Sequence, residues 1–413
     1  MIEGFFTKKE VESITRPAGK VGTCVTCGLH RTCESPQMKP FGNFKKKILN
    51  IGEAPGEAED RTGKPWQGKV GKLLQKTYSS LGIDLFEDCV NINAVLCRPV
   101  DLKGTNRPPS NFEAECCRRS VLRTIEEYCP HKIIILGNTA LYSIIGHRCM
   151  KDLGTISKWR GFTIPDLDFN AWLCPTFHPS YIERVSEQPD VQAIWKRDLK
   201  QAFALGALPK YNEPEIEIIE DLSVLKRIKG PVAIDYETTG LKPHAAGHRV
   251  VCAAVADSPD HTYAFLMPET KAERQPFLDL LANPKVGKMA HNMKFEDTWS
   301  VVRLRQPVVN WYWDSMQAAH ILDNRPGITS LKFQTYVQLG VVDYASEISP
   351  YLHAVDNSDG NGLNRVLELL TVPGGTEKLL TYCALDTIYE YRLAMLQQSQ
   401  ILLPFYSWKH YQQ

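Results

Sequence analysis

The sequence has no long hydrophobic run, no leader pattern and almost no net charge. No apolar stretch approaches the roughly 20 residues that a membrane-spanning helix needs, so we expect no membrane partner. The N-terminus lacks the basic start, apolar middle and small-residue cleavage site of a signal peptide, which favours a cytoplasmic location. The net charge of +1 neither indicates nor excludes nucleic acid as a partner.

The composition is that of a soluble globular protein with ample core. At 413 residues the chain is too long for one ordinary domain, and 43% of its residues are hydrophobic and 23% charged. Its 12 cysteines are numerous for a reducing compartment. We therefore interpret them as metal ligands and buried residues, because disulfides rarely persist there.

The first half of the sequence alternates strand-like and helix-like segments, which predicts a parallel sheet covered on both faces. The expected strands are 48–51, 90–95, 132–136 and 172–176. The expected helices are 69–81, 112–128, 138–145 and 191–205.

A Pro- and Glu-rich stretch near residue 210 divides the chain into two expected domains. We expect a first domain over 1–210, a linker over 211–228 and a second domain over 229–413. The second domain begins with strand-like segments at 231–237, 250–256 and 263–266, and helices at 331–339 and 377–398 follow. The fold class is therefore α/β, with two domains.

An acidic loop broken by Gly and Pro, residues 52–60, follows the apolar segment 48–51. Open α/β sheets bind ligands at the carboxyl ends of their strands, so this loop is a candidate site. Basic residues crowd around it and could neutralise phosphates, although a solvated lysine face would look the same. They are Lys39, Lys45, Lys46, Lys47, Arg61, Lys64, Lys69, Lys72 and Lys76.

Four cysteines form a candidate metal or cluster site. Cys24 and Cys27 lie on one tight turn as Cys-x-x-Cys, and Cys97 and Cys117 bring the count to four. From spacing alone, zinc is an alternative to an iron–sulfur cluster, and Cys116 competes with Cys117 for the fourth position. The remaining cysteines of this half are expected to be packing residues: Cys33, Cys89, Cys129, Cys149 and Cys174.

With these cysteines, an ordered set of motifs over residues 20–205 resembles the family 4 uracil-DNA glycosylases, which carry a 4Fe–4S cluster. The motifs are Gly-Glu-Ala-Pro-Gly-x-x-Glu-Asp at 52–60, Gly-Lys-Pro-Trp-Gln-Gly at 63–68, Asn-Ala-Val-Leu-Cys at 93–97, Asn-Arg-Pro-Pro-Ser at 106–110 and His-Pro-Ser-Tyr at 178–181. The resemblance implies a three-layer αβα fold around a parallel sheet. It also implies Cys24, Cys27, Cys97 and Cys117 as the cluster ligands, since the family's spacing selects Cys117 over Cys116.

The resemblance further implies a pocket for a uracil flipped out of DNA. Trp66, where the family usually has Phe, would stack on the base, and Asn93 would offer its amide to the N3–H and O4 edge. Gly52 and Ser180, from the same motifs, complete the expected substrate-binding set.

Cleavage of the glycosidic bond places negative charge on uracil O2 and positive charge on the sugar. The resemblance implies that His178 stabilises that oxygen. A carboxylate must also position water, and we expect Glu59 to do so while Glu53 shapes the pocket, because Ala54 stands where another glycosylase family keeps an aspartate. Taken singly, each of these residues could be structural, as a core aromatic, a turn or a helix cap.

Two departures from related enzymes are visible. The spacer after Cys97 is longer, at residues 100–105, which alters a loop that would face DNA. No histidine lies between Glu53 and Asn93, so we disfavour the chemistry of a related group that traps DNA covalently with such a residue.

A second candidate site lies in the second half of the chain. Asp235 and Glu237 end an apolar strand and point to the same side, since alternate residues of a strand share a face. Tyr382 and Asp386 lie one turn apart on a predicted helix. A buried acidic pair is too costly without a cation, so these carboxylates predict a metal site.

Residues 229–400 resemble the DEDDy 3′–5′ exonucleases, especially the proofreading domains of family A DNA polymerases, which implies an RNase H-like fold. In that family Asp235, Glu237, Glu296 and Asp386 would bind two Mg²⁺ or Mn²⁺ ions, and Tyr382 would orient the attacking water. Glu296 stands where the family has aspartate, with Asp297 beside it, so we expect reduced activity.

Three functions are compatible with these patterns. The first is a bifunctional enzyme that excises uracil and removes 3′ nucleotides from DNA. The second is a replication module, because the chain resembles the N-terminal part of bacteriophage replicative polymerases. Few residues follow Asp386, so any polymerase would be a separate subunit or a lost C-terminal portion. The location would be the host cytoplasm if a phage encodes the chain. The third is a non-catalytic iron–sulfur platform that binds DNA.

Overall fold

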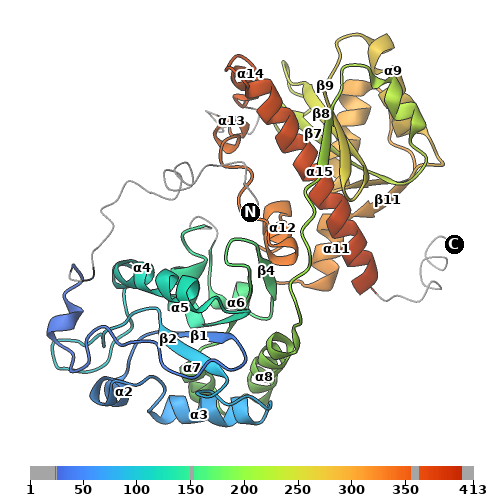
Figure 1. The fold of residues 1–413 in the computed structure, drawn as a ribbon. Helices are drawn as coiled ribbons and strands as arrows, with labels where there is room; N and C mark the ends of the chain where they lie inside the picture. Colours follow the sequence, from blue (N-terminus) through green and yellow to red (C-terminus); the bar gives the residue numbers. More distant parts are fainter. Residues whose placement is uncertain (1–23, 25, 149–152, 355–361, 402–413) are drawn as a thin grey trace. The chain divides into compact units, whose positions relative to one another are not determined.

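The chain folds into two compact units, Met1–Pro209 and Lys210–Gln413 (Figure 1). The structure is a computed structural model, and it describes residues 24, 26–148, 153–354 and 362–401. Each unit has its own sheet and its own core, as expected for two α/β domains.

The first unit is built on a five-stranded sheet with the order β2-β1-β3-β5-β4. Four strands are parallel, and β4 is antiparallel to β5. The parallel strands are buried along nearly their whole length, which explains their continuous apolar runs. The strands are β1 (Ile48–Gly52), β2 (Cys89–Asn93), β3 (Lys132–Leu136), β4 (Ile164–Asp166) and β5 (Ala171–Thr176).

Helices cover both faces of this sheet and make it the middle of three layers (Figure 1). One face carries α4 (Asn111–Tyr128), α5 (Gly137–Ile144) and α6 (Ile156–Trp159). The other carries α3 (Lys69–Ser79), α7 (Pro179–Arg184) and α8 (Pro189–Ala204), with α2 (Glu57–Thr62) in the acidic loop and the short η1 (Leu29–Arg31) before the sheet. The three-layer prediction is confirmed.

The second unit has a six-stranded mixed sheet with the order β11-β10-β7-β8-β9-β6. The antiparallel pairs are β7–β8 and β8–β9, and the remaining pairs are parallel. The strands are β6 (Glu215–Ile218), β7 (Val232–Thr238), β8 (Val250–Ser258), β9 (His261–Leu266), β10 (Lys288–Ala290) and β11 (Trp311–Asp314).

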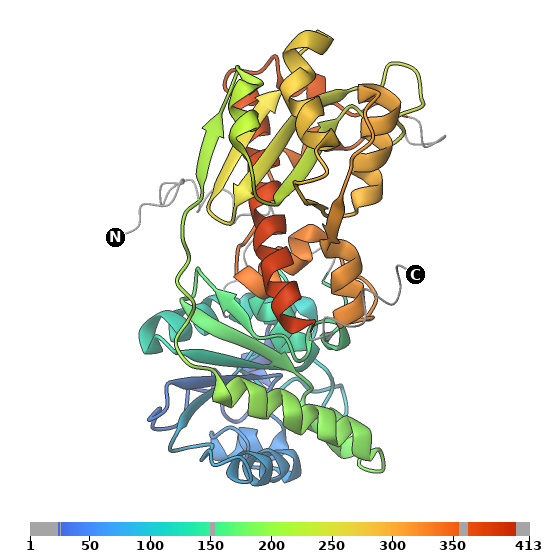
Figure 2. The ribbon, with the colours of Figure 1, turned by 90° about the vertical axis from the view of Figure 1, so that its right-hand side faces the viewer.

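The long helix α15 (Gly375–Gln400) packs across one face of this sheet, and α9 (Lys271–Ala282) with η2 (Leu222–Arg227) covers the other (Figure 2). The alternation along β7 decides which side chains meet α15. Ile234 and Tyr236 enter the core beneath α9, so Asp235 and Glu237 face α15. The other elements are α10 (Met293–Trp299), the π-helical η3 (Ser300–Leu304), α11 (Ser315–Leu322), α12 (Leu331–Leu339), α13 (Ser349–Leu352) and α14 (Val366–Leu369).

The expected linker differs from what the structure shows. Within 211–228, β6 pairs with β9, and η2 buries Leu222, Leu225 and Ile228 in the core of the second unit. The Glu and Pro residues in and before β6 led to its prediction as a connector. An edge strand that is exposed along most of its length needs few apolar residues, so its sequence resembles that of a linker. Within the described residues, no helix is long and apolar enough to cross a bilayer.

Candidate active sites of the two units

The ends of β1 and β2 bring three predicted pocket residues together. Gly52 lies opposite Asn93 in the parallel register. A Cβ atom on Gly52 would lie 2.4 Å from Asn93 Oδ1 and 2.9 Å from the indole ring of Trp66. An added methyl group would therefore displace the Asn93 amide or the Trp66 ring, so the three residues are packed close together at this strand end.

The Trp66 ring reaches this space from a tightly held loop. Trp66 has a left-handed backbone, with φ of 59°. A Cβ on Gly71 would lie 2.1 Å from the Trp66 carbonyl oxygen, which also accepts a hydrogen bond from Gln75 Nε2 at 3.0 Å. Helix α3 thus packs directly against the backbone of this loop. The side chain of Trp66 is 6% exposed.

His178 lies next to the Trp66 ring, with ring centroids 5.8 Å apart and planes inclined by 36°. It is the N-cap of α7, and its Nδ1 accepts from the Ser180 backbone N–H at 3.2 Å and lies 2.7 Å from Ser180 Oγ. Since Nδ1 is the acceptor, the ring proton of the neutral imidazole is on Nε2. Burial, helped by the charge of Arg184, lowers the pKa of His178 to about 4, so the ring is neutral at pH 7.

The carboxylate of Glu59 is used to hold the loop. Its Oε1 accepts from the backbone N–H groups of Gln67 and Gly68, each at 3.0 Å. Its Oε2 accepts from the N–H of Gly56 at 3.1 Å, which caps α2. With three backbone donors already bound, this side chain has little capacity left to hold a water molecule.

Glu53 is the other carboxylate at this strand end, immediately after Gly52. Burial raises the pKa of Glu53, and the positive charge of Arg184 partly offsets that effect. Arg184 acts on His178 as well, which places Glu53, Arg184 and His178 around the same part of the site.

The four predicted cluster ligands lie close together. Cys117 interacts electrostatically with Cys24, Cys27 and Cys97, although Cys116 is also hydrogen-bonded to Cys27. Two sulfurs receive backbone N–H groups: Cys97 Sγ from Gln37 at 3.3 Å and Cys117 Sγ from Leu96 at 3.5 Å. Such donors stabilise thiolates, and they tune the potential of iron–sulfur clusters.

The second unit brings three of its four predicted acids into one group. Ligand oxygens of Asp235, Glu237 and Asp386 lie within 4.8 Å of one another. Burial and the neighbouring charge of Asp386 raise the pKa of Asp235 to about 7, and burial and the charge of Asp235 raise the pKa of Glu237 well above its usual value. Three carboxylates in such a site call for a cation.

Glu296 lies beside this group, and Asp297 points elsewhere. Glu296 is 2% exposed, and burial and the charge of Asp235 raise its pKa. Its Oε2 has no hydrogen-bond partner among the described residues. Asp297 instead accepts from the indole N–H of Trp311 at 3.2 Å. The structure therefore places the longer side chain at the acidic group.

Two tyrosines and a lysine complete the surroundings of Asp386. Tyr344 Oη donates to Asp386 Oδ1 at 2.6 Å, and Lys332 Nζ forms an ion pair with the same oxygen. The ammonium of Lys332 lies 3.8 Å from the ring centroid of Tyr344 and 4.3 Å from that of Tyr382. Burial and the carboxylates, Asp386 first, raise the pKa of Tyr382, so its phenol stays protonated.

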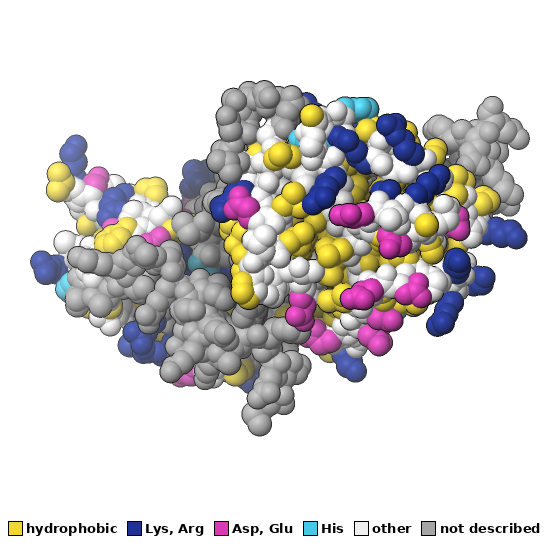
Figure 3. All heavy atoms as spheres, turned by 90° about the horizontal axis from the view of Figure 1, so that it is seen from above, with side chains coloured by type: hydrophobic (Ala, Val, Ile, Leu, Met, Phe, Trp, Pro, Cys, Tyr) yellow, Lys and Arg dark blue, Asp and Glu magenta, His cyan; other side chains and the backbone are white. Residues whose placement is uncertain are grey.

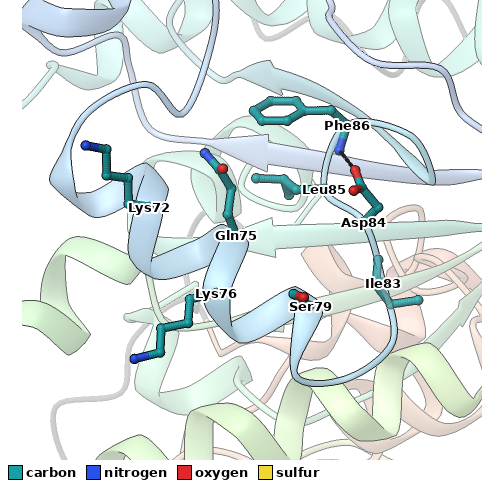
Figure 4. Close-up of a pocket in the computed structure, with 8 residues that line it drawn as sticks. All are labelled: Lys72, Gln75, Lys76, Ser79, Ile83, Asp84, Leu85 and Phe86. Atoms are coloured by element: carbon teal, nitrogen blue, oxygen red, sulfur yellow. Dashed lines mark hydrogen bonds between the residues drawn. The ribbon is translucent and has the colours of Figure 1, made fainter.

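The basic residues near the first site are partly engaged. Lys45, Lys46 and Lys69 pair with carboxylates. Lys72 and Lys76 line a cavity of about 400 Å³ beside α3 (Figure 4), whose lining contains none of the pocket residues described above. The face seen in Figure 3 mixes basic, acidic and apolar side chains.

Comparisons with known proteins show the class of protein to which each unit belongs. Residues 39–200 match the Uracil DNA glycosylase superfamily, and residues 213–399 match the 3'-5' exonuclease family found in DNA polymerase A proteins. The chain is therefore a two-domain protein with two DNA-processing hydrolase domains.

The particular family follows from the relatives. The chain is 34% identical over 197 residues to the type-4 uracil-DNA glycosylase of Thermotoga maritima, an alignment that covers 48% of this chain and 95% of the relative. It is 33% identical to that of Saccharolobus solfataricus, covering 46% of this chain and 86% of the relative. The chain belongs to the type-4 uracil-DNA glycosylases, and the exonuclease domain follows the glycosylase domain in the sequence.

A DNA polymerase of Bacillus phage SP01 is 30% identical over 175 residues, which cover 42% of this chain and 17% of that polymerase. The chain thus spans under a fifth of that relative.

The sequence analysis missed the residues that support the predicted ones. Lys332 and Tyr344 contact Asp386 from α12 and from the segment after it, and neither has a distinctive spacing to the acids. Ser180 belongs to the expected substrate-binding set, and its hydroxyl and N–H are directed at His178. The His-Pro-Ser sequence at a helix start was the available signal for that contact, because N-terminal N–H groups bind the capping side chain.

Proposed function

We propose that this protein excises uracil from DNA with its first unit and removes 3′ nucleotides with its second. The observation that carries the first activity is the convergence of Gly52, Trp66, Asn93 and His178 on one space. If these residues had only a structural role, there would be no reason for position 52 to lack a side chain where the Asn93 amide and the Trp66 indole meet. A non-catalytic DNA platform is correspondingly less favoured.

In the excision step, His178 would donate its Nε2 proton as a hydrogen bond to uracil O2. The neutral ring fits this task, because Ser180 occupies Nδ1 and burial holds the pKa of His178 near 4. Removing such a donor typically costs about 2.7–4 kcal/mol of transition-state stabilisation. Asn93 would select uracil, since cytosine presents an amino group where uracil presents O4.

We assign the positioning of water to Glu53 instead of Glu59. Glu59 has three backbone donors on its carboxylate, whereas Glu53 has a raised pKa at the end of β1 beside the pocket. Glu59 would then act by holding the Trp66 loop in place. The roles predicted from sequence are thereby exchanged.

Cys24, Cys27, Cys97 and Cys117 would hold the 4Fe–4S cluster. The donor set fits: four thiols meet from distant parts of the chain, and backbone N–H groups serve two of the sulfurs. Zinc fits less well, since Zn–S bonds of about 2.3 Å place sulfurs about 3.8 Å apart. Among the described cysteines, no three have sulfurs within 4.8 Å of one another. The cluster would tie the segment before β1 to α4.

Asp235, Glu237 and Asp386, with Glu296 beside them, would hold two divalent cations such as Mg²⁺ or Mn²⁺. The cations would supply the charge that stabilises the attacking and leaving oxygens. Tyr382, kept protonated by its surroundings, would donate to the attacking water and orient it.

The partners that we propose are uracil-containing DNA and single-stranded 3′ ends. The similarity to a phage DNA polymerase favours a replication context, in which the chain works with a polymerase.

The deciding experiment combines a uracil-containing oligonucleotide with a 5′-labelled single strand, each assayed with and without chelator. Excision should persist in chelator, while shortening of the strand should require Mg²⁺ or Mn²⁺. His178→Ala should lose excision by about 10²–10³-fold and keep the nuclease, and Asp235→Asn should do the reverse. Absence of alkali-labile sites from the uracil strand refutes the first activity, and a strand that stays full length refutes the second.

The cluster has a separate test. Anaerobically purified protein should be brown and contain iron and sulfide, and Cys117→Ser should lose both. Iron retained in Cys117→Ser but lost in Cys116→Ser would transfer the fourth ligand position to Cys116.

A further inference from the structure

The acidic site of the second unit contains a buried carboxylate beyond the four expected from sequence. Glu390 lies one helical turn after Asp386 on α15, so Tyr382, Asp386 and Glu390 share one face of the helix. Its side chain is 1% exposed. Packing alone does not account for it, because an acidic group is among the most expensive to bury.

The surroundings of Glu390 identify it as part of the same site. After burial, the largest influences on its pKa are the charges of Glu296, Asp235 and Asp314, all of which raise it. Its carboxylate also accepts from the backbone N–H of His291, in the turn that leads from β10 into α10 and Glu296. Glu390 therefore lies near both Asp235 and Glu296.

Two oxygens in this region lack a partner. Glu390 Oε1 and Glu296 Oε2 are both fully buried and have no hydrogen bond within the described parts of the chain. Oxygen-only sites with carboxylates are those that Mg²⁺ and Mn²⁺ prefer. A cation shared by these oxygens would compensate both.

We propose that Glu390 is a fifth carboxylate of the exonuclease centre and binds a divalent cation together with Glu296. This inference rests on the proposed exonuclease function. It also explains the departure at position 296: the longer Glu296 side chain reaches a cation position that Glu390 helps to define. The centre is thus built for one more carboxylate ligand than the sequence pattern indicates.

The test is Mn²⁺ titration of the full-length protein by calorimetry, after removal of divalent cations. Glu390→Gln keeps the shape of the side chain and removes the charge, and Glu377→Gln makes the same change at an exposed position of α15. We expect Glu390→Gln to weaken the binding of at least one Mn²⁺ ion by tenfold or more, in the range found when residues that support a metal are replaced. Glu377→Gln should bind as the wild type does.

Melting without metal separates ligation from a structural role. Ligation predicts that Glu390→Gln melts at or above the wild-type temperature without divalent cations and gains less from Mn²⁺ than the wild type does. A lower metal-free melting temperature with unchanged Mn²⁺ affinity overturns the proposal. Should Glu390→Gln not fold, Glu390→Asp is compared instead, and unchanged Mn²⁺ binding in that variant overturns the proposal equally.

Failure of the proposed function gives a different result. If the wild type binds no Mn²⁺ and resembles Asp235→Asn in the titration, the exonuclease assignment fails, and this inference with it. If the wild type binds Mn²⁺, Asp235→Asn does not, and Glu390→Gln matches the wild type, only the role of Glu390 is refuted. Uracil excision, measured in every variant, verifies that the first unit is intact.

Discussion

At the residue scale, small differences in contact decide the role of each side chain. Glu53 and Glu59 belong to one motif, yet one is a half-buried acid just after a strand and the other binds three backbone donors of its own loop. His178 and Ser180 act as a unit, because the N–H of Ser180 fixes which nitrogen of the imidazole carries the proton.

Gly52→Ala tests the shape of the uracil pocket. Its methyl group would lie 2.4 Å from Asn93 Oδ1 and 2.9 Å from the Trp66 ring, so we expect excision to fall at least about 100-fold because a misplaced site loses that much. Nuclease activity should not change. Gly206→Ala, where no atom lies within 4 Å of the added methyl, is the matched control and should behave as the wild type. Excision by Gly52→Ala at the wild-type rate would contradict the pocket.

Glu53→Gln and Glu59→Gln distinguish the base from the anchor. Glu53→Gln should lower kcat for excision without lowering the melting temperature. Glu59→Gln should lower the free energy of unfolding by about 1–3 kcal/mol, because an amide nitrogen cannot accept the backbone N–H groups that an oxygen now accepts. Rates on uracil-containing DNA and thermal melts of both variants are the measurements. A larger loss of kcat in Glu59→Gln with unchanged melting would restore Glu59 as the base.

Wild-type excision should also depend on pH through Glu53. Its pKa is raised by burial, so its base form is lost at a higher pH than for an exposed glutamate, and kcat should fall as pH decreases through that value. His178 should add no step between pH 5 and 8, because its pKa is about 4. A pH–rate profile of wild type and Glu53→Gln measures this, and an unchanged slope in the variant would argue against the assignment.

At the element scale, helix ends hold the functional residues in place. Helix α4 carries Cys117 and begins with a capping box in which Ser110 and Glu113 bind each other's backbone N–H groups. Arg107 adds an ion pair to Glu113. In the second unit, α15 places Asp386 opposite β7, whose alternation directs Asp235 and Glu237 toward it.

Ser110→Ala should weaken the start of α4. Loss of this N-cap is expected to lower the free energy of unfolding by about 1 kcal/mol, measured by denaturant titration. Iron content at 25 °C should stay at the wild-type level, since Cys117 lies two turns into the helix. Loss of iron without loss of stability would mean that the cap acts on the cluster directly.

At the scale of the whole molecule, the two units are separate in sequence and in chemistry. Each has its own sheet and core, and among the described residues only those of the second unit form an acidic group that calls for divalent cations. Divalent cations should therefore act on stability through the second unit.

Without divalent cations, the stability advantage of Asp235→Asn over the wild type should grow as pH rises from about 4 to 7. Asp235 has a folded pKa of about 7 and an unfolded value near 3.9. The folded state thus binds more protons in this range, and the unfolding free energy falls with rising pH. Melting temperatures of both proteins test this, and Mn²⁺ should restore the wild type. A difference that does not vary with pH would contradict the raised pKa.

The sequence by itself determined the two α/β domains and most strands and helices of both. It also named candidate residues at the two sites, but not Lys332, Tyr344 or Glu390. Apolar runs and their period record burial directly, so segments such as 132–136 and 331–339 were predicted to the residue. It failed at β6 and η2, which were assigned to a linker because an exposed edge strand has little apolar pattern.

Only the tertiary structure distinguished the roles of the acidic side chains at the two sites. Glu59 holds the Trp66 loop because that loop folds back onto its carboxylate, and Glu296, not Asp297, lies at the acidic group because Trp311 binds Asp297 from β11. We propose Glu390 as a ligand because α15 brings it near Glu296 and Asp235. The physical reason is common to all three. A carboxylate's role depends on the donors and charges that surround it, and those come from parts of the chain that are distant in sequence and meet only in the fold.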